Sequence, residues 1–249
     1  MPALDPNDFT IGAGEMSFAA FKSETDQTPG AFRFIGDVPT FSLNREVQEL
    51  EKKGNTRGIR SVVKTLVLEE NFTGSLVTES VNFQNLAYYL SGEAREVAQV
   101  ALTGESETFA GVKAGDQFQL GQSDARPSGV RGLANVTVGA LVEGTDYVVH
   151  AEIGMIEFLK DAATATVTYD AAANTRIQVI PTGRQVEGAL KFISYASGRK
   201  VDYYIPYATL AASGELNIIT EEWQQVPLSF KVSRLRGLAP IYIDGRPAV

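Results

Sequence analysis

The sequence is dominated by short segments in which apolar and polar residues alternate with a period of two. The clearest run is 226–233, where valine, leucine, phenylalanine and valine alternate with proline, serine, lysine and serine. A second run, 164–169, alternates threonines with alanine, valine and tyrosine. Successive side chains of a strand point to opposite faces, so this pattern predicts strands with one buried face. We therefore expect a mainly β fold.

Further β-prone segments occur along the whole chain. Additional strands are predicted at 15–21, 41–43, 62–68, 135–138, 147–149, 156–158 and 216–219. The segments 190–195 and 201–207 flank a turn sequence and predict a β-hairpin. Residues 1–14 and 237–249 are rich in glycine and proline, and we expect them to be terminal arms.

One segment has the spacing of a helix instead, with apolar residues at i, i+3, i+4 and i+7: Phe83, Leu86, Ala87 and Leu90. This spacing places them on one helical face. Thr78 or Ser80 is expected to cap the start of the helix, and Gly92 to end it in the left-handed conformation. A short amphipathic helix of this kind is expected to pack against a sheet.

Residues 105–173 look like a separate unit. Loop-like sequences flank them, Thr-Gly-Glu at 103–105 and Ala-Ala-Ala-Asn at 171–174. Since strands are predicted on both sides, we interpret 105–173 as a small β-rich domain inserted into a core domain made of 1–104 and 174–249. The insert holds ten acidic and four basic side chains, and it carries most of the net charge of −8.

The segment 45–60 is densely charged. Its charged side chains are Arg45, Glu46, Glu49, Glu51, Lys52, Lys53, Arg57 and Arg60. A segment with so little apolar surface cannot order itself by burial. We therefore expect a long charged loop between two strands, either solvated or ordered by contact with a partner.

The composition excludes several classes of site. There is no cysteine, which rules out disulfides and thiolate metal ligands and fits assembly in a reducing cytoplasm. The single histidine, His150, rules out a site built on two imidazoles, and we interpret it as structural. No apolar run approaches the ~20 residues of a membrane-spanning helix, so no membrane partner is expected. An acidic chain without a basic block is a poor candidate for binding nucleic acid phosphates.

No catalytic motif is found. The chain has no G-x-S-x-G nucleophile elbow, no phosphate-binding loop with its lysine and no calcium-binding loop. The pairs Glu69-Glu70 and Glu221-Glu222 supply neighbouring carboxylates, but adjacent residues of a strand point to opposite faces. We therefore predict no catalytic residue, no cofactor and no metal, and we expect that the protein is not an enzyme.

The order of these features resembles one known family. The segments concerned are IGAGEMSFAAF, GAFRFIGDVPTFSLNREVQELE and GNTRGIRSVVKTLVLEENFTGSLVTESVNFQNLAYYLSG, followed later by GALKFISYASGRKVDYYIPYATLAASGELNIITEEWQQVPLSFKV and PIYIDGR. They cover about residues 11–102 and 185–246 and are similar to the major tail tube proteins of siphophages and related prophages. The insert is not part of this resemblance.

The resemblance implies a tail-tube-type β-sandwich or barrel with one flanking helix, whose copies form hexameric rings stacked around a channel for DNA. It implies a virion protein that is assembled in the host bacterial cytoplasm. Its partners would be further copies of itself, the tape measure protein and the tail terminator and tip proteins. DNA is expected to pass through the channel during ejection without specific binding.

The resemblance also assigns residues to these roles. In this family a long hairpin loop reaches the next ring, and the matching residues are the eight charged side chains of 45–60. The channel of the family is lined by acidic side chains. Glu46, Glu69 and Glu70 are the candidates for that wall, because they lie on or beside the strands that the family uses for its inner barrel.

Two other classes of protein remain open. One is a β-sandwich decoration or binding module whose acidic insert contacts a ligand or a host surface. The other is a carboxylate-based glycosidase. Assembly distinguishes the first from a tube subunit, because a tube protein forms rings or polymers. An activity screen against bacterial polysaccharides would expose the second.

Overall fold

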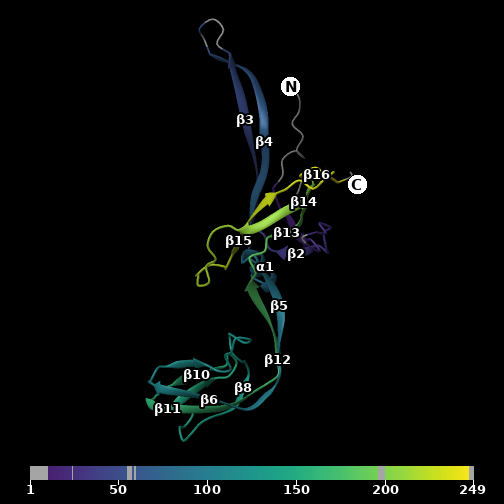
Figure 1. Cartoon of the computed structure of the whole chain (residues 1–249). Helices are drawn as coiled ribbons and strands as arrows, with labels where there is room; N and C mark the ends of the chain where they lie inside the picture. Colours follow the sequence, from purple (N-terminus) through teal and green to yellow (C-terminus); the bar gives the residue numbers. More distant parts are fainter. Residues whose placement is uncertain (1–10, 24, 55–57, 59, 196–199, 247–249) are drawn as a thin grey trace. The chain divides into compact units, whose positions relative to one another are not determined.

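The computed structural model describes residues 11–23, 25–54, 58, 60–195 and 200–246 (Figure 1). These residues are mainly in β-strands and include a single short helix, which confirms the predicted fold class. The chain divides into two compact units, one made of residues 1–94 and 179–249 and the other of residues 95–178. No helix in the described part of the chain is long and apolar enough to span a membrane.

The first unit is built on one antiparallel sheet of eight strands. Its order is β2-β1-β13-β14-β15-β4-β3, and β16 pairs with the first part of β14. The strands are β1 (Gly14–Ala20), β2 (Arg33–Gly36), β3 (Thr40–Gly54), β4 (Ser61–Thr78), β13 (Val186–Ser194), β14 (Val201–Ala212), β15 (Val226–Val232) and β16 (Tyr242–Gly245). The predicted hairpin is confirmed as the pair β13–β14, and the alternating run that begins at Val226 is confirmed as β15.

Helix α1 (Phe83–Tyr89) forms where the apolar spacing predicts it, but the predicted caps are wrong. The N-cap is Asn82, whose side-chain oxygen accepts hydrogen bonds from two backbone N–H groups of the first turn at 3.1 and 2.9 Å. At the other end Ser91, and not Gly92, takes the left-handed conformation, with a φ of 48°. A Cβ on Gly92 would lie 2.4 Å from the carbonyl oxygen of Ile180, so this glycine serves the close approach of two strands.

The core of the first unit lies on one face of the sheet. Phe41 of β3 stacks on Phe192 of β13 and on Phe230 of β15, with ring centroids 5.7 Å apart in each pair. Because β3 and β13 are not neighbours in the sheet, the sheet curls around this cluster. The ring of Tyr88 in α1 is buried and meets Phe18 of β1 edge-on at 5.3 Å, so the helix covers the same core.

The C-terminal segment is part of the sheet and not a free arm. Within the predicted arm 237–249, β16 pairs with β14. Arg246 then donates two hydrogen bonds to Asp202 of β14, both at 2.9 Å. The guanidinium lowers the pKa of the Asp202 carboxyl. Glycine and proline on either side conceal this four-residue strand in the sequence. Of the predicted N-terminal arm, residues 1–10 lie outside the described residues.

The strand predicted at 216–219 is not formed. Residues 213–225, all of them described, connect β14 to β15 without a strand. Leu216 packs against the core, whereas Ile218 and Ile219 are exposed. These apolar residues follow one another without regular alternation, so a strand here could not bury them on one face.

The second unit has its own core between two three-stranded antiparallel sheets. The sheets have the orders β6-β11-β8 and β7-β10-β9. Their strands are β6 (Leu102–Val112), β7 (Gln117–Gln119), β8 (Leu133–Val138), β9 (Tyr147–His150), β10 (Met155–Phe158) and β11 (Ala162–Ala171). Ile156, Phe158 and Val167 are completely buried in this core. The four strands predicted in this region are confirmed as β8 to β11.

The second unit extends beyond the predicted limits of 105 and 173. Strands β5 (Gly92–Gln99) and β12 (Asn174–Pro181) pair with each other and run across the boundary between the units. The buried side chain of Gln99 donates hydrogen bonds to the carbonyl oxygens of Arg131 and Ala172, at 2.7 and 2.8 Å. It also accepts one from the Arg131 N–H at 3.0 Å. These bonds lie within the second unit, so the end of β5 is part of its structure.

Closing the chain across β5 and β12 tests whether the first unit folds without the second. Gly92 lies against Ile180, so a short Asn-Gly turn can join Ala94 to Val179. We expect this variant, which lacks residues 95–178, to give a cooperative thermal transition by circular dichroism. The separate 95–178 fragment should also unfold cooperatively, because it has its own core. A variant that stays insoluble with every turn length would contradict this expectation.

Candidate functional site: the open sheet face and the β3–β4 hairpin

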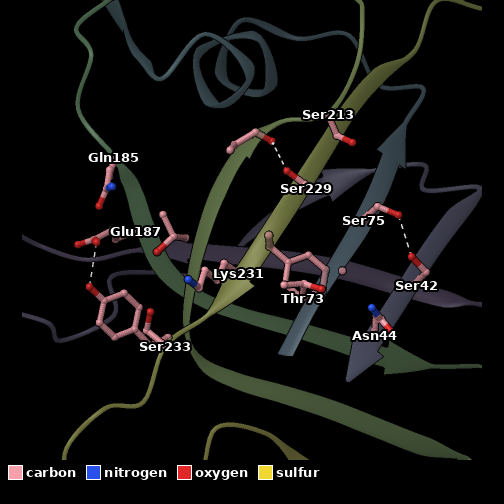
Figure 2. A pocket seen from close by; sticks show the side chains of 15 residues that line it. Ser42, Asn44, Thr73, Ser75, Gln185, Glu187, Ser213, Ser229, Lys231 and Ser233 are labelled. Carbon is pink, nitrogen blue, oxygen red and sulfur yellow. Dashed lines mark hydrogen bonds between the residues drawn. The ribbon is translucent and has the colours of Figure 1, made fainter. Parts of the chain in front are cut away.

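The face of the sheet opposite the core, here called the polar face, is lined by small polar side chains (Figure 2). It arises from the alternation in β15, where Ser229 and Lys231 point away from the core that buries Leu228 and Phe230. Its hydroxyl and amide residues are Ser42, Asn44, Thr73, Ser75, Gln185, Tyr207, Thr209, Ser213, Ser229 and Ser233. They line an open depression of about 820 Å³.

Few charges lie in this depression. The charged residues that line it are Glu187 and Lys231. The Tyr207 hydroxyl donates a 2.8 Å hydrogen bond to Glu187, and burial together with this bond raises the pKa of the tyrosine. A carboxylate, an ammonium group and many hydroxyls make a well-hydrated surface of nearly balanced charge.

The titratable side chains of the described residues form no metal site. Among the described residues, no group of three or more histidine, cysteine, aspartate or glutamate side chains could hold a metal ion. The single histidine, His150 of β9, lies 3.3 Å from Glu157 of the adjacent strand β10. The pair lies on a partly exposed part of the second unit.

Strands β3 and β4 extend beyond the rest of the sheet as a two-stranded hairpin (Figure 1). β15 pairs with β4 only over 72–78, whereas β3 pairs with β4 from Thr40 to Gly54. Most of 45–60, predicted as a loop, is therefore strand. The prediction is wrong because the backbone ladder, and not side-chain burial, organises this segment. The side chains of 60–71 are exposed throughout.

The register of the hairpin separates the three carboxylates that were predicted for a channel wall. Glu46 belongs to the polar face, because it follows Ser42 at an even spacing on β3, and Glu69 joins it because it lies opposite Gln48. Glu70 points to the other face, where Arg45 donates a 2.6 Å hydrogen bond to it. The structure therefore brings two of the three candidates together and gives the third an ion-pair partner.

The side chains that were predicted to contact a neighbour divide between the same two faces. One face of β3 carries Arg45, Glu49, Glu51 and Lys53. Glu46 and Lys52 lie on the other face, which continues the polar face. Arg60 is exposed just before β4, and Arg57 lies outside the described residues.

Sequence reasoning missed the apolar surface of this hairpin. Six apolar side chains of the hairpin are between 49% and 68% exposed, namely Leu50, Val62, Val63, Leu66, Val67 and Leu68. Two register shifts make Val63 and Leu68 bulged residues of β4. Leu66 and Val67 are adjacent and point to opposite faces, so apolar side chains lie on both faces of the hairpin. The available signal was the run VVKTLVL at 62–68, which is apolar without clean alternation. Exposed apolar side chains gathered on one element in this way are typical of an interaction surface.

Comparison with known proteins places this architecture in a family. Residues 9–234 match the model of the family described as "Protein of unknown function UCP028589", and the chain belongs to that family. The matched residues include the hairpin, the polar face and the whole of 95–178. A search of the curated proteins found no match.

Substitution of Gly74 tests how closely the polar face and the core are packed. A Cβ at Gly74 would lie 2.2 Å from the Ser42 carbonyl oxygen and 2.3 Å from the Phe230 ring. We expect Gly74→Ala to lower the free energy of unfolding by roughly 1–3 kcal/mol, because the packed neighbours must shift. The control Ser75→Ala removes one hydroxyl and should change it by about 1 kcal/mol or less. Urea denaturation measures both, and equal effects would contradict the prediction.

Proposed function

We propose that this protein is the tail tube subunit of a long-tailed bacteriophage or a related prophage, and that its copies form stacked hexameric rings around a channel for DNA. The observation that carries the proposal is the hairpin, which leaves the sheet with apolar side chains exposed on both faces. An isolated two-stranded hairpin is marginally stable in water. Burial against another molecule removes its apolar surface from water and stabilises it.

The edges of the sheet support assembly side by side. β3 is 15 residues long and pairs, among the described strands, with β4 alone. A long unpaired edge is a template for a strand of another molecule. Joining the sheets of neighbouring copies into a closed barrel would occupy such edges and leave the polar face on the inside.

The polar face suits the wall of a channel in which DNA must slide. Its hydroxyls bind water, and Glu187 and Lys231 nearly balance in charge. Glu46 and Glu69 add negative charge where the face continues along the hairpin. Repulsion of phosphates acts over about 8–10 Å at physiological salt, so such a wall would not hold a passing duplex.

Negative-stain microscopy of the purified chain tests the proposal. We expect rings or tubes from the parent protein. The variant Leu50→Ser, Val63→Ser, Leu66→Ser should stay folded and monomeric, because it removes the apolar surface that a neighbour would cover. A parent chain that remains small at every concentration would overturn the proposal and favour a binding module.

A matched control shows whether the position of the serines matters. Val142, Ile153 and Leu159 of the second unit are 59%, 49% and 44% exposed. Replacing these three with serine removes a similar amount of exposed apolar surface. This control should assemble like the parent. Loss of assembly in both variants would show that the hairpin has no special part in it.

The charge of the channel wall can be tested on assembled tubes. Parent tubes should not sediment with short duplex DNA at low salt. Glu46→Lys with Glu69→Lys should bind it at least about tenfold more tightly, because each lysine near a phosphate releases counterions. The control Glu143→Lys with Glu152→Lys makes the same change in net charge on exposed residues of the second unit. Equal DNA binding by the two variants would show that Glu46 and Glu69 do not face the channel.

A further inference from the structure

The loop 213–225 presents three large apolar side chains to solvent. Ile218 is 80% exposed, Ile219 is 96% exposed and Trp223 is 84% exposed. They are not needed for the core of their own unit, to which the loop contributes Leu216 instead. Such large side chains in water on one short loop indicate a surface that another molecule covers.

Hydrogen bonds hold this loop in place. The Gln224 side chain donates to the Asn217 carbonyl oxygen at 2.9 Å, and the Tyr89 hydroxyl of α1 donates to the Gly214 carbonyl oxygen at 2.7 Å. The side chain of Gln225 donates to the Glu79 carboxylate at 3.0 Å. The exposed isoleucines and tryptophan therefore belong to a loop whose conformation is held by hydrogen bonds.

The charges around these apolar residues are all of one sign. Residues 213–225 contain three glutamates and no basic residue. Trp223 shares a depression with Glu79, Glu221 and Glu222. An exposed indole beside carboxylates attracts ammonium groups by a cation–π interaction with the ring and by the negative charge of the carboxylates. This surface therefore fits a partner that is apolar and basic.

The end of the β3–β4 hairpin has that composition. We define the hairpin tip as 50–54 and 60–68; its basic side chains are Lys52, Lys53, Arg60 and Lys64, and Glu51 is its single acid. Lys52 lies directly opposite Lys64, a like-charge pair that destabilises a sheet when it is left alone. Neither lysine has an ion-pair partner among the described residues.

The two surfaces lie at opposite ends of one strand. β4 begins at Ser61 in the hairpin tip and ends at Thr78, which pairs with Val226 immediately after the loop 213–225. At about 3.3 Å per residue the 18 residues of β4 span roughly 55–60 Å. The tip and the loop of one molecule therefore cannot meet (Figure 1). Those of two molecules stacked head to tail can meet.

We infer that the hairpin tip of one copy docks on the loop 213–225 of a copy in the next ring. Lys52 and Lys64 meet Glu221 and Glu222 around Trp223, while the apolar residues of the tip cover the isoleucines of the loop. This inference rests on the proposed function and names the surface that receives the hairpin. It also accounts for two lysines on a strand face that continues the polar face. Docked carboxylates neutralise them, so they would not hold DNA.

Disulfide cross-linking tests this contact, because the chain contains no cysteine of its own. Full-length Val63→Cys and Ile219→Cys chains are mixed, assembled and oxidised. Peptide mass spectrometry then measures the bond between positions 63 and 219. The control mixture pairs Val63→Cys with Val142→Cys, an exposed position in the second unit. We expect about tenfold more cross-link than in the control, because docked thiols react at an effective concentration near millimolar.

The outcomes separate this inference from the proposed function. A parent chain that forms neither rings nor tubes overturns both. Tubes in which the 63–219 bond is no more abundant than the control bond overturn the docking inference alone. Tubes in which Ile219→Cys chains cross-link mainly to one another also overturn it, because that contact would be symmetric and not head to tail.

A charge exchange gives an independent test. Glu221→Lys with Glu222→Lys should prevent tube growth, and so should Lys52→Glu with Lys64→Glu, because each change places like charges against each other. A chain that carries all four substitutions should form tubes again, since opposite charges then meet with the signs exchanged. Tubes from either double variant, or none from the combined variant, would overturn the inference.

Discussion

An antiparallel sheet has two faces, and the described part of this chain has one helix of seven residues to cover them. That helix and the curling of the sheet around Phe41, Phe192 and Phe230 complete the core on one face. The other face remains in water, which explains why β15 places serine and lysine there. The long edge of β3 is likewise left without a covering element in the described residues. The polar side chains of the open face are stable in water, whereas the apolar side chains of the hairpin are exposed to it.

Regular alternation predicted the strands in which it is longest, but it did not predict short strands such as β2, where Ile35 is completely buried. The alternating runs that became β11 and β15 are the clearest examples, because their periodicity directly reflects the core. The run 62–68 was predicted correctly as a strand, but its exposure was not foreseen, and the strand predicted at 216–219 is absent. Both the run 62–68 and the loop 213–225 contain large exposed side chains. Pattern reasoning assumes that apolar residues are covered by their own molecule, and here that assumption does not hold.

The densely charged segment 45–60 was visible in the sequence, but the polar face and the geometry of the segment were not. The pairing of 45–54 as strand depends on backbone hydrogen bonds, which leave no mark on the side-chain pattern. The division of Glu69 from Glu70 follows from simple alternation. The faces of the residues beyond them depend on the bulges at Leu68 and Val63, which no composition reveals.

The apolar residues of the hairpin have a consequence for how a neighbour could bind it. Leu66 lies opposite Leu50 and Val67 lies opposite Glu49, so the two apolar side chains point to opposite faces of a ribbon only two strands wide. A single flat surface covers one side of such a ribbon and leaves the apolar side chains of the other side exposed to water. A slot between two adjoining molecules covers both. In a stacked assembly the hairpin would then be covered on both sides only where two neighbouring molecules adjoin. A completed ring would therefore be the template for the next ring.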